Sequence, residues 1–233
     1  MASKGFTVIG HRGAKGHVAE NTLASFDKAL ALGVKWVELD VQWHAGKLWV
    51  FHDARLDRCT DGKGWLADLD AKALRKLDAG GGEKIPLLED VLERIDRRCS
   101  VNVELKTGDG TGAATAAVLR QFIAKGWKPE QFLVSSFLLP ELREFKRRLP
   151  DVPLGVLLCG VPLDLAAAAT QLGASVVSLD MDFADPALIA DAHARGMRVY
   201  VYTVNLPEDM RRMRKLGADG VFTDFPDRAK GIK

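Results

Sequence analysis

A repeated pattern of apolar and polar positions organises most of the 233-residue chain. A segment with helical apolar periodicity ends at a glycine, and a run of β-branched or aromatic residues begins within a few positions. The glycines at these junctions are Gly33, Gly126, Gly173, Gly196 and Gly217. Glycine closes the last turn of a helix in the left-handed conformation, and a short loop then leads into a buried strand. The pattern therefore predicts a helix, a glycine and a strand as the repeating unit.

The repeat supplies a series of strand candidates, with helical patterns such as 22–31 and 113–124 between most of them. The strand candidates are 6–9, 35–41, 100–105, 132–135, 153–158, 175–179, 198–202 and 220–222. Eight strand-helix units predict an α/β fold of the (β/α)8 TIM-barrel type. A doubly wound open sheet is the alternative, but it seldom has so many units, and no G-x-G-x-x-G motif follows the first strand.

Two segments interrupt the repeat after the second strand. Residues 47–51 predict an extra strand, and residues 53–86 form a long connection rich in Asp and Gly. A connection of this length between packed units is more often a functional cap than a plain linker, so we expect it to cover the barrel mouth. The chain length suits one barrel with a small insertion, and residues 1–233 are predicted to form a single domain.

Composition and charge restrict the partners and the location. Apolar residues make up 47% of the chain, enough for a substantial core, and no apolar run approaches a membrane span. Lys and Arg number 33 against 31 Asp and Glu, so we expect no nucleic-acid partner and no stable membrane association. Cys59, Cys99 and Cys159 lie far apart and are predicted to be reduced and unpaired. The first apolar run, 6–9, is too short for a secretion signal, which predicts a cytoplasmic location.

Charged side chains gather where the predicted strands end. His11 follows the first strand, Glu38 and Asp40 close the second, and Glu104 and Lys106 close the third. Because side chains alternate between the two faces of a strand, the two charged residues of each strand point the same way. Each pair is therefore expected to converge on one surface of the barrel.

Three carboxylates at one end of a barrel require compensation. Glu38, Asp40 and Glu104 would repel one another in apolar surroundings unless a cation lay among them. All-oxygen ligation favours a hard ion, so the sequence predicts a divalent cation site for Mg²⁺ or Ca²⁺. The alternative is a buried salt bridge, in which Lys106 pairs with Glu104 while Asp40 caps a turn. Charged pairs on two adjacent predicted strands favour the functional interpretation.

Two histidines suit acid-base chemistry beside such a cation. His11 and His52 both end strands, and histidine titrates near neutrality, so the pair could supply a general base and a general acid. Arg12 could bind a phosphate through its planar guanidinium, and Lys106 could stabilise a developing oxyanion. A hydrogen-bonded structural histidine and an ordinary salt bridge are the alternatives for each residue taken alone.

Further candidates lie in a loop and on two strand ends. Glu20, Asn21 and Thr22 precede the first predicted helix, and helix capping accounts for Asn21 and Thr22 but not for Glu20. Tyr202 and Phe137 lie near strand ends and are predicted to face the substrate.

Taken together, these residues resemble the glycerophosphodiester phosphodiesterase family, and within it the compact cytosolic bacterial members. The matching segments are His11-Arg12-Gly13, Glu20-Asn21-Thr22, Glu38-Leu39-Asp40, His52-Asp53, Glu104-Leu105-Lys106, Ser135-Ser136-Phe137, Tyr202-Thr203-Val204-Asn205 and Thr223-Asp224. They follow in order over nearly the whole chain, which makes the match more specific than any single motif. Ala19 stands where the family usually has Pro, a departure that is expected to loosen the loop carrying Glu20. Tyr202 stands where many members have Trp, so selectivity for the alcohol group stays open.

The resemblance implies hydrolysis of small-molecule glycerophosphodiesters, the deacylated remains of phospholipids, to sn-glycerol 3-phosphate and an alcohol. The implied residues are a metal trio of Glu38, Asp40 and Glu104, a catalytic pair of His11 and His52, and phosphate contacts at Arg12 and Lys106. The resemblance also implies a barrel with an inserted segment after the second strand.

Several alternatives stay open at this point. The nucleophile is water or the neighbouring glycerol hydroxyl, which would pass through a cyclic phosphate, and either histidine could be the base. One alternative function is a lipid-directed phosphodiesterase that acts on lysophospholipids or is similar to sphingomyelinase D toxins, although those toxins are secreted and carry disulfides. Another is a catalytically silent barrel that binds a phosphorylated metabolite, which would need no acid-base pair. The native metal, the preferred alcohol and the oligomeric state are likewise open.

Overall fold

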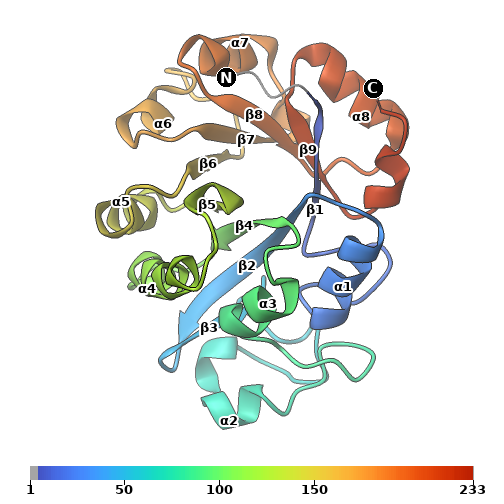
Figure 1. Ribbon diagram of the computed structural model, residues 1–233, viewed down its shortest axis with the longest axis vertical. Coiled ribbons are helices and arrows are strands. Elements are labelled where there is room, and N and C mark those ends of the chain that lie inside the picture. Colours follow the sequence, from blue (N-terminus) through green and yellow to red (C-terminus); the bar gives the residue numbers. More distant parts are fainter. Residues whose placement is uncertain (1–4, 233) are drawn as a thin grey trace.

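The computed structural model describes residues 5–232, so residues 1–4 and 233 lie outside the described range. Its centre is a ring of eight parallel strands (Figure 1). These strands are β1 (Thr7–Gly10), β2 (Trp36–His44), β4 (Ser100–Leu105), β5 (Phe132–Ser136), β6 (Leu154–Leu158), β7 (Val176–Asp180), β8 (Arg198–Tyr202) and β9 (Gly220–Thr223). The order around the ring is β1-β9-β8-β7-β6-β5-β4-β2, and β1 pairs with β2 to close it. The predicted TIM barrel is therefore confirmed.

Helices surround the ring of strands on its outer side (Figure 1). They are α1 (Leu23–Ala31), α3 (Leu88–Ile95), α4 (Thr111–Ala124), α5 (Leu139–Arg148), α6 (Ala167–Gln171), α7 (Pro186–Ala194) and α8 (Pro207–Leu216). The glycines predicted to end helices all have positive φ, between 61° and 110°, which confirms the helix-glycine-strand unit. Of the helices in this part of the chain, none combines the length and the hydropathy of a membrane span.

The eighth strand-helix unit differs from the prediction. After β9 the chain forms only a short 3-10 helix, η4 (Pro226–Ala229), where an α-helix was expected. Gly231 follows with φ 84°, a left-handed conformation that does not continue a right-handed helix. The barrel is therefore closed by eight strands, and within the described residues its last strand is followed by one short 3-10 helix.

Alternation along the barrel strands separates the apolar core from the polar interior. On β2, Val37, Leu39 and Val41 belong to the large core between strands and helices, whereas Glu38 and Asp40 point to the other side. A smaller apolar cluster joins strands from all around the ring, and therefore fills the barrel interior. Its buried members are Ile9, Leu133, Val176, Tyr200 and Phe222. This plug supports the polar side chains that lie nearer the strand ends.

The interruption after β2 forms a separate small layer. Strand β3 (Lys47–Val50) pairs antiparallel with the end of β2, as the extra strand predicted for 47–51 should. The following segment contains η1 (Leu66–Asp68) and α2 (Ala71–Leu74), and it has its own apolar cluster around Trp49. In Figure 1, β3 and α2 lie together beyond the ring of barrel strands. The segment is thus anchored by its own core beside the barrel.

Candidate active site

A cavity of about 190 Å³ opens at the carboxyl ends of the barrel strands. It is lined by His11, Arg12, Glu38, His52, Asn102, Glu104, Lys106, Phe137, Leu157, Tyr202, Thr203 and Phe222. Most residues that the sequence singled out therefore share one cavity. Asp40 lies beside it as a neighbour of the other carboxylates, whereas Glu20 is not among its lining residues.

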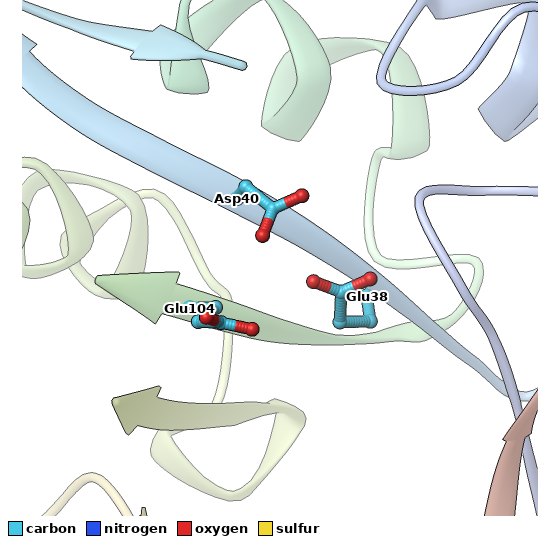
Figure 2. A group of neighbouring side chains, drawn as sticks. All are labelled: Glu38, Asp40 and Glu104. Atoms are coloured by element: carbon cyan, nitrogen blue, oxygen red, sulfur yellow. The ribbon is translucent and has the colours of Figure 1, made fainter. Parts of the chain in front are cut away.

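Three carboxylates gather at one side of this cavity, and two of them, Glu38 and Glu104, line it. The parallel register of β2 and β4 places Asp40 opposite Glu104, with Glu38 two positions back on β2. One oxygen from each carboxylate lies within 4.8 Å of the others. Figure 2 shows the three side chains directed toward a common space between the two strands. The geometry can accommodate a metal ion with oxygen ligands.

Burial makes this group electrostatically unfavourable without a cation. Glu38 and Asp40 are almost completely buried, and Glu38 Oε1 and Asp40 Oδ1 have no hydrogen-bond partner. Burial and the nearby Asp40 carboxylate raise the pKa of Glu38 well above its usual value. For the same two reasons the pKa of Glu104 rises to about 7. A bound cation would satisfy both unpartnered oxygens and remove the repulsion, so these residues fit a metal site.

Lys106 also compensates part of this negative charge. Its Nζ lies 2.7 Å from Glu104 Oε1 and 3.8 Å from Asp40 Oδ1. The salt bridge considered as an alternative is thus present, although Asp40 does not cap a turn. Instead Asp40 Oδ2 accepts a hydrogen bond from Asn21 Nδ2 at 2.9 Å. This ammonium leaves Glu38 Oε1 and Asp40 Oδ1 without a hydrogen bond, so the salt bridge does not replace a cation.

His11 is held from the side of β9. Its Nδ1 lies 2.6 Å from Asp224 Oδ1, and its Nε2 lies 4.0 Å from Glu38 Oε2. Asn205 holds Asp224 in turn, by donating to Oδ2 at 3.0 Å and by accepting from the Asp224 backbone amide at 2.8 Å. Burial lowers the pKa of His11, although the hydrogen bond to Asp224 acts in the opposite direction. The contact to Asp224 leaves Nε2 as the nitrogen nearer the carboxylates.

His52 is held from the side of the inserted segment. Its Nδ1 lies 2.6 Å from Asp53 Oδ1, and Arg58 donates to the same carboxylate. Burial is the main cause of the lowered pKa of His52, with Asp40 opposing it. Both histidines therefore use Nδ1 for an aspartate, which leaves each Nε2 available for a substrate.

Arg12 lies between the carboxylates and the loop before α1. Its backbone amide donates to Glu38 Oε2 at 2.8 Å, its Nη1 donates to Glu20 at 2.6 Å, and its Nε lies 3.2 Å from Asp40. The loop turns sharply here, because φ is positive at Arg12 and at Gly13, and a side chain at Gly13 would collide with Ser25. Arg12 is thus a fixed, buried cation at the edge of the cavity.

Helix capping was the wrong prediction for Asn21 and the right one for Thr22. Thr22 is the N-cap residue of α1, and its side chain accepts from the amide of Ser25. Asn21 is buried with φ 57° and instead uses its amide on Asp40. From sequence alone, a polar residue one position before the N-cap cannot be told from the N-cap itself. Here the fold distinguishes them, because the loop brings Asn21 against Asp40 on β2.

Two aromatic rings form the outer part of the cavity. Phe137 and Tyr202 both line the cavity and pack edge to face with centroids 6.1 Å apart. The Tyr202 hydroxyl donates to the carbonyl of Leu158 at 2.8 Å, so the ring is fixed from the neighbouring strand. Phe137 is 44% exposed and therefore extends from the cavity to the surface.

A larger hollow of about 760 Å³ lies on the other side of Glu20 and Arg58. It is lined by the loop from Lys15 to Glu20 and by parts of the inserted segment, including Cys59 and Asp78. Neither catalytic candidate histidine nor any member of the carboxylate trio lines it. The smaller cavity is therefore the candidate active site.

Sequence reasoning missed the contacts through which five residues hold this site together. They are Asn21, Asp53, Arg58, Asn205 and Asp224. All but Arg58 belong to segments of the family pattern, but their partners lie on other elements, so the pattern alone could not show what they contact. Arg58 belongs to none of those segments, and its exposed position in a loop resembles that of an ordinary surface cation.

Comparisons with known proteins agree with this geometry. Residues 11–228 match the family model described as "Glycerophosphoryl diester phosphodiesterase family". The glycerophosphodiester phosphodiesterase of Caldanaerobacter subterraneus is 36% identical over 230 residues, covering 94% of each chain. That of Bacillus altitudinis is 33% identical and covers 97% of each chain.

Solved structures show the same relationship. A phosphodiesterase from Oleispira antarctica, solved in complex with the product sn-glycerol-3-phosphate, has a TM-score of 0.89 and 31% identity over 97% of this chain and 96% of its own. A putative glycerophosphoryl diester phosphodiesterase from Silicibacter pomeroyi also reaches a TM-score of 0.89, at 28% identity over 99% of this chain and 94% of its own. The chain therefore belongs to the glycerophosphoryl diester phosphodiesterase family.

Proposed function

We propose that this protein hydrolyses glycerophosphodiesters to sn-glycerol 3-phosphate and an alcohol, with a divalent cation and two histidines as the catalytic groups. One observation supports this most strongly. His11 and His52 line the same cavity as two of the three clustered carboxylates, and each imidazole is fixed through Nδ1 by an aspartate. A protein that only binds a phosphorylated metabolite would need no pair of oriented imidazoles.

The cation would be held by Glu38, Asp40 and Glu104. When bound, it supplies charge stabilisation for the non-bridging oxygens of the phosphodiester. The donor atoms are all carboxylate oxygens, which supports Mg²⁺ or Ca²⁺ over softer ions. Lys106 would then turn from Glu104 toward the phosphate, where its ammonium offsets negative charge.

The histidines would move the protons of the reaction. The lowered pKa values of His11 and His52 keep at least one imidazole neutral near pH 7, as a general base must be. The other would carry a proton on Nε2 as an imidazolium, which its aspartate partner stabilises, and would donate that proton to the leaving alkoxide. Arg12 would hold the phosphate from the side through guanidinium N–H groups. Phe137 and Tyr202 would contact the organic part of the substrate.

The proposal is tested by incubating the protein with glycerophosphocholine and Mg²⁺ or Ca²⁺ and measuring sn-glycerol 3-phosphate by coupled oxidation. Turnover in ¹⁸O-labelled water, with a search for a cyclic phosphate, distinguishes direct attack by water from attack by the neighbouring glycerol hydroxyl. Absence of glycerol 3-phosphate with either ion would refute the function.

A second candidate substrate is a lysophospholipid, which keeps one acyl chain. The exposed large apolar side chains among the described residues include six on the loops that follow β5, β6, β7 and β8. They are Phe137, Leu138, Val161, Leu163, Phe183 and Leu206. These four strands are neighbours in the ring, so their loops form adjacent parts of the cavity mouth. An apolar surface beside a phosphodiester site suits an acyl chain.

Comparison of lysophosphatidylcholine with glycerophosphocholine tests this candidate. An acyl chain that binds the rim should lower KM for the lysolipid, and Leu163→Asp should remove that advantage while glycerophosphocholine turnover stays unchanged. A higher kcat/KM for glycerophosphocholine in both proteins would leave the deacylated compound as the substrate.

A cytoplasmic location and the lack of a nucleic-acid partner or stable membrane association also stay proposals.

A further inference from the structure

Arg58 lies on the inserted segment and makes two-contact ion pairs with two different carboxylates. Its Nε and Nη2 donate to Asp53 at 2.6 and 2.9 Å. Its Nη1 and Nη2 donate to Glu20 at 2.8 and 2.7 Å. A planar guanidinium can serve four carboxylate oxygens in this way, whereas the ammonium of a lysine cannot.

The two carboxylates bound by Arg58 also hold two residues of the active-site cavity. Glu20 Oε1 accepts from both Arg12 Nη1 and Arg58 Nη2. Asp53 Oδ1 contacts both His52 Nδ1 and Arg58 Nη2. One nitrogen of Arg58 therefore touches the same two oxygens that fix Arg12 and His52. This continuous chain of contacts joins the loop before α1 to the segment after β3.

We propose that Arg58 is a positioning residue for the reaction: it fixes Glu20 and Asp53, so that Arg12 and His52 face the same phosphate. The inference rests on the proposed function and assigns the inserted segment a part in it. Arg58 itself does not line the cavity, so it acts through its two carboxylate partners.

The electrostatics of the bridge agree with a positioning role. Hydrogen bonds from Arg58 are the main cause of the low pKa of Asp53, about 2, so Asp53 stays an anionic acceptor for His52 across the neutral range. Burial would raise the pKa of Glu20, but hydrogen bonds from Arg58 and Arg12 hold it below its usual value. The Arg58 side chain is 47% exposed, and exposed ion pairs contribute little to folding stability. Its effect should therefore appear in the reaction more than in the fold.

Arg55 provides a matched control on the same segment. Its side chain is 53% exposed, its Nε lies 3.2 Å from Asp57, and its guanidinium lies 5.5 Å from the Trp65 ring centroid. These partners, Asp57 and Trp65, do not line the active-site cavity. Arg55→Ala removes the same charge from the same segment without breaking the bridge.

The experiment measures kcat and KM for glycerophosphocholine with the full chain and Mg²⁺ or Ca²⁺, together with melting temperature. Arg58→Ala should lower kcat roughly 10- to 100-fold, as loss of a residue that orients a catalytic group does, and should also raise KM. Arg58→Lys should recover only a small part of kcat, while added guanidinium ion should recover more of it in Arg58→Ala. Arg55→Ala should match the wild type.

Two further variants separate the two ends of the bridge. Asp53→Asn acts on His52 and should mainly lower kcat, whereas Glu20→Gln acts on Arg12 and should mainly raise KM. Combined with Arg58→Ala, each should cost less than it does alone, because the contact it removes is already loosened. Additive losses would mean that the two carboxylates do not depend on Arg58.

Each remaining outcome also decides the inference. Unchanged kcat and KM in Arg58→Ala, or losses equal to those of Arg55→Ala, would overturn it. An activity loss that only follows the folded fraction of a less stable Arg58→Ala would show a purely structural role and overturn it too. A wild type that fails to hydrolyse glycerophosphocholine would refute the proposed function itself, which distinguishes that failure from failure of the bridge.

Discussion

The two histidines of the cavity are supported by different kinds of structure. His11 is held by Asp224 at the end of β9, and Asp224 is held by Asn205, so its support belongs to the barrel. His52 is held by Asp53, whose partner Arg58 belongs to the inserted segment. The side chain of His11 is 14% exposed and that of His52 is 30% exposed. The barrel thus holds the more buried imidazole, and the insertion holds the one that is nearer to water.

This difference suggests how new substrates can be accommodated on one fold. The strands that hold His11 also close the barrel, so changes there affect stability and chemistry together. The insertion has its own apolar cluster and can change without disturbing the barrel ladder. The His52 side should therefore tolerate variation better than the His11 side.

Removal of either imidazole is the strongest way to test the comparison. His11→Ala and His52→Ala should each lower kcat by roughly 10²- to 10⁴-fold, the range for loss of general acid or base catalysis. Steady-state kinetics with glycerophosphocholine, and circular dichroism to verify the fold, measure this. Near-normal turnover by either variant would remove that histidine from the mechanism.

Loss of the cation should lower activity whichever histidine is considered, because the carboxylates that hold the cation belong to neither histidine's support. Exhaustive chelation, or Glu38→Gln, should lower kcat on the order of 10²- to 10³-fold, because charge on the phosphate oxygens is no longer stabilised. Mg²⁺ or Ca²⁺ should restore the chelated wild type but not Glu38→Gln. Full activity after verified metal removal would contradict the role of the carboxylate trio.

The two supporting aspartates compare the barrel with the insertion directly. Asp224→Asn and Asp53→Asn should each cost roughly 10- to 100-fold in kcat, as residues that orient a catalytic ligand do. The cost should be larger for Asp224, because the histidine that it holds is more buried than His52. Parallel kcat measurements decide the order, and a larger loss in Asp53→Asn would reverse the proposed contrast.

The smallest expected effect concerns folding stability, which should depend on pH through Glu104, a carboxylate of the same cavity as the two histidines. Without metal, the pKa of Glu104 is raised from 4.5 to about 7, so the folded state binds a proton that the unfolded state releases between these pH values. This carboxyl therefore destabilises the fold as pH rises through that window, by on the order of 3 kcal/mol. In the presence of chelator, Glu104→Gln should have the same melting temperature as the wild type near pH 4.5 and a higher melting temperature than the wild type near pH 8. Equal melting temperatures at both pH values would argue against the raised pKa.

The repeat of helix, glycine and strand predicted the barrel well because each signal is local. Residues 100–105 and 198–202 coincide with β4 and β8. The second strand was predicted to end at Val41 but continues to His44, because β3 folds back and pairs with that extension. Pairing between segments is a tertiary effect that periodicity within one segment does not contain.

The catalytic candidates were predictable for a similar reason, since strand ends can be read from sequence and parallel strand ends meet. The residues that support them were not predictable, because their partners lie elsewhere in the sequence. Asn21 contacts a residue 19 positions away, Arg58 contacts residues 5 and 38 positions away, and Asp224 contacts a residue 213 positions away. Composition around these residues resembles that of ordinary caps and surface loops. Only the closed barrel brings them to the same cavity.

The pairing of β1 with β9 has a consequence for how the protein matures on the ribosome. His11 follows the first barrel strand in chain order, whereas Asp224 follows the last, and these two strands pair with each other in the ring. The imidazole therefore lacks its acceptor until nearly all of the described chain has left the exit tunnel. Contacts so distant in sequence form late, because a long loop must close first. Hydrolytic competence should thus appear only after the last barrel strand has been synthesised and has paired with the first.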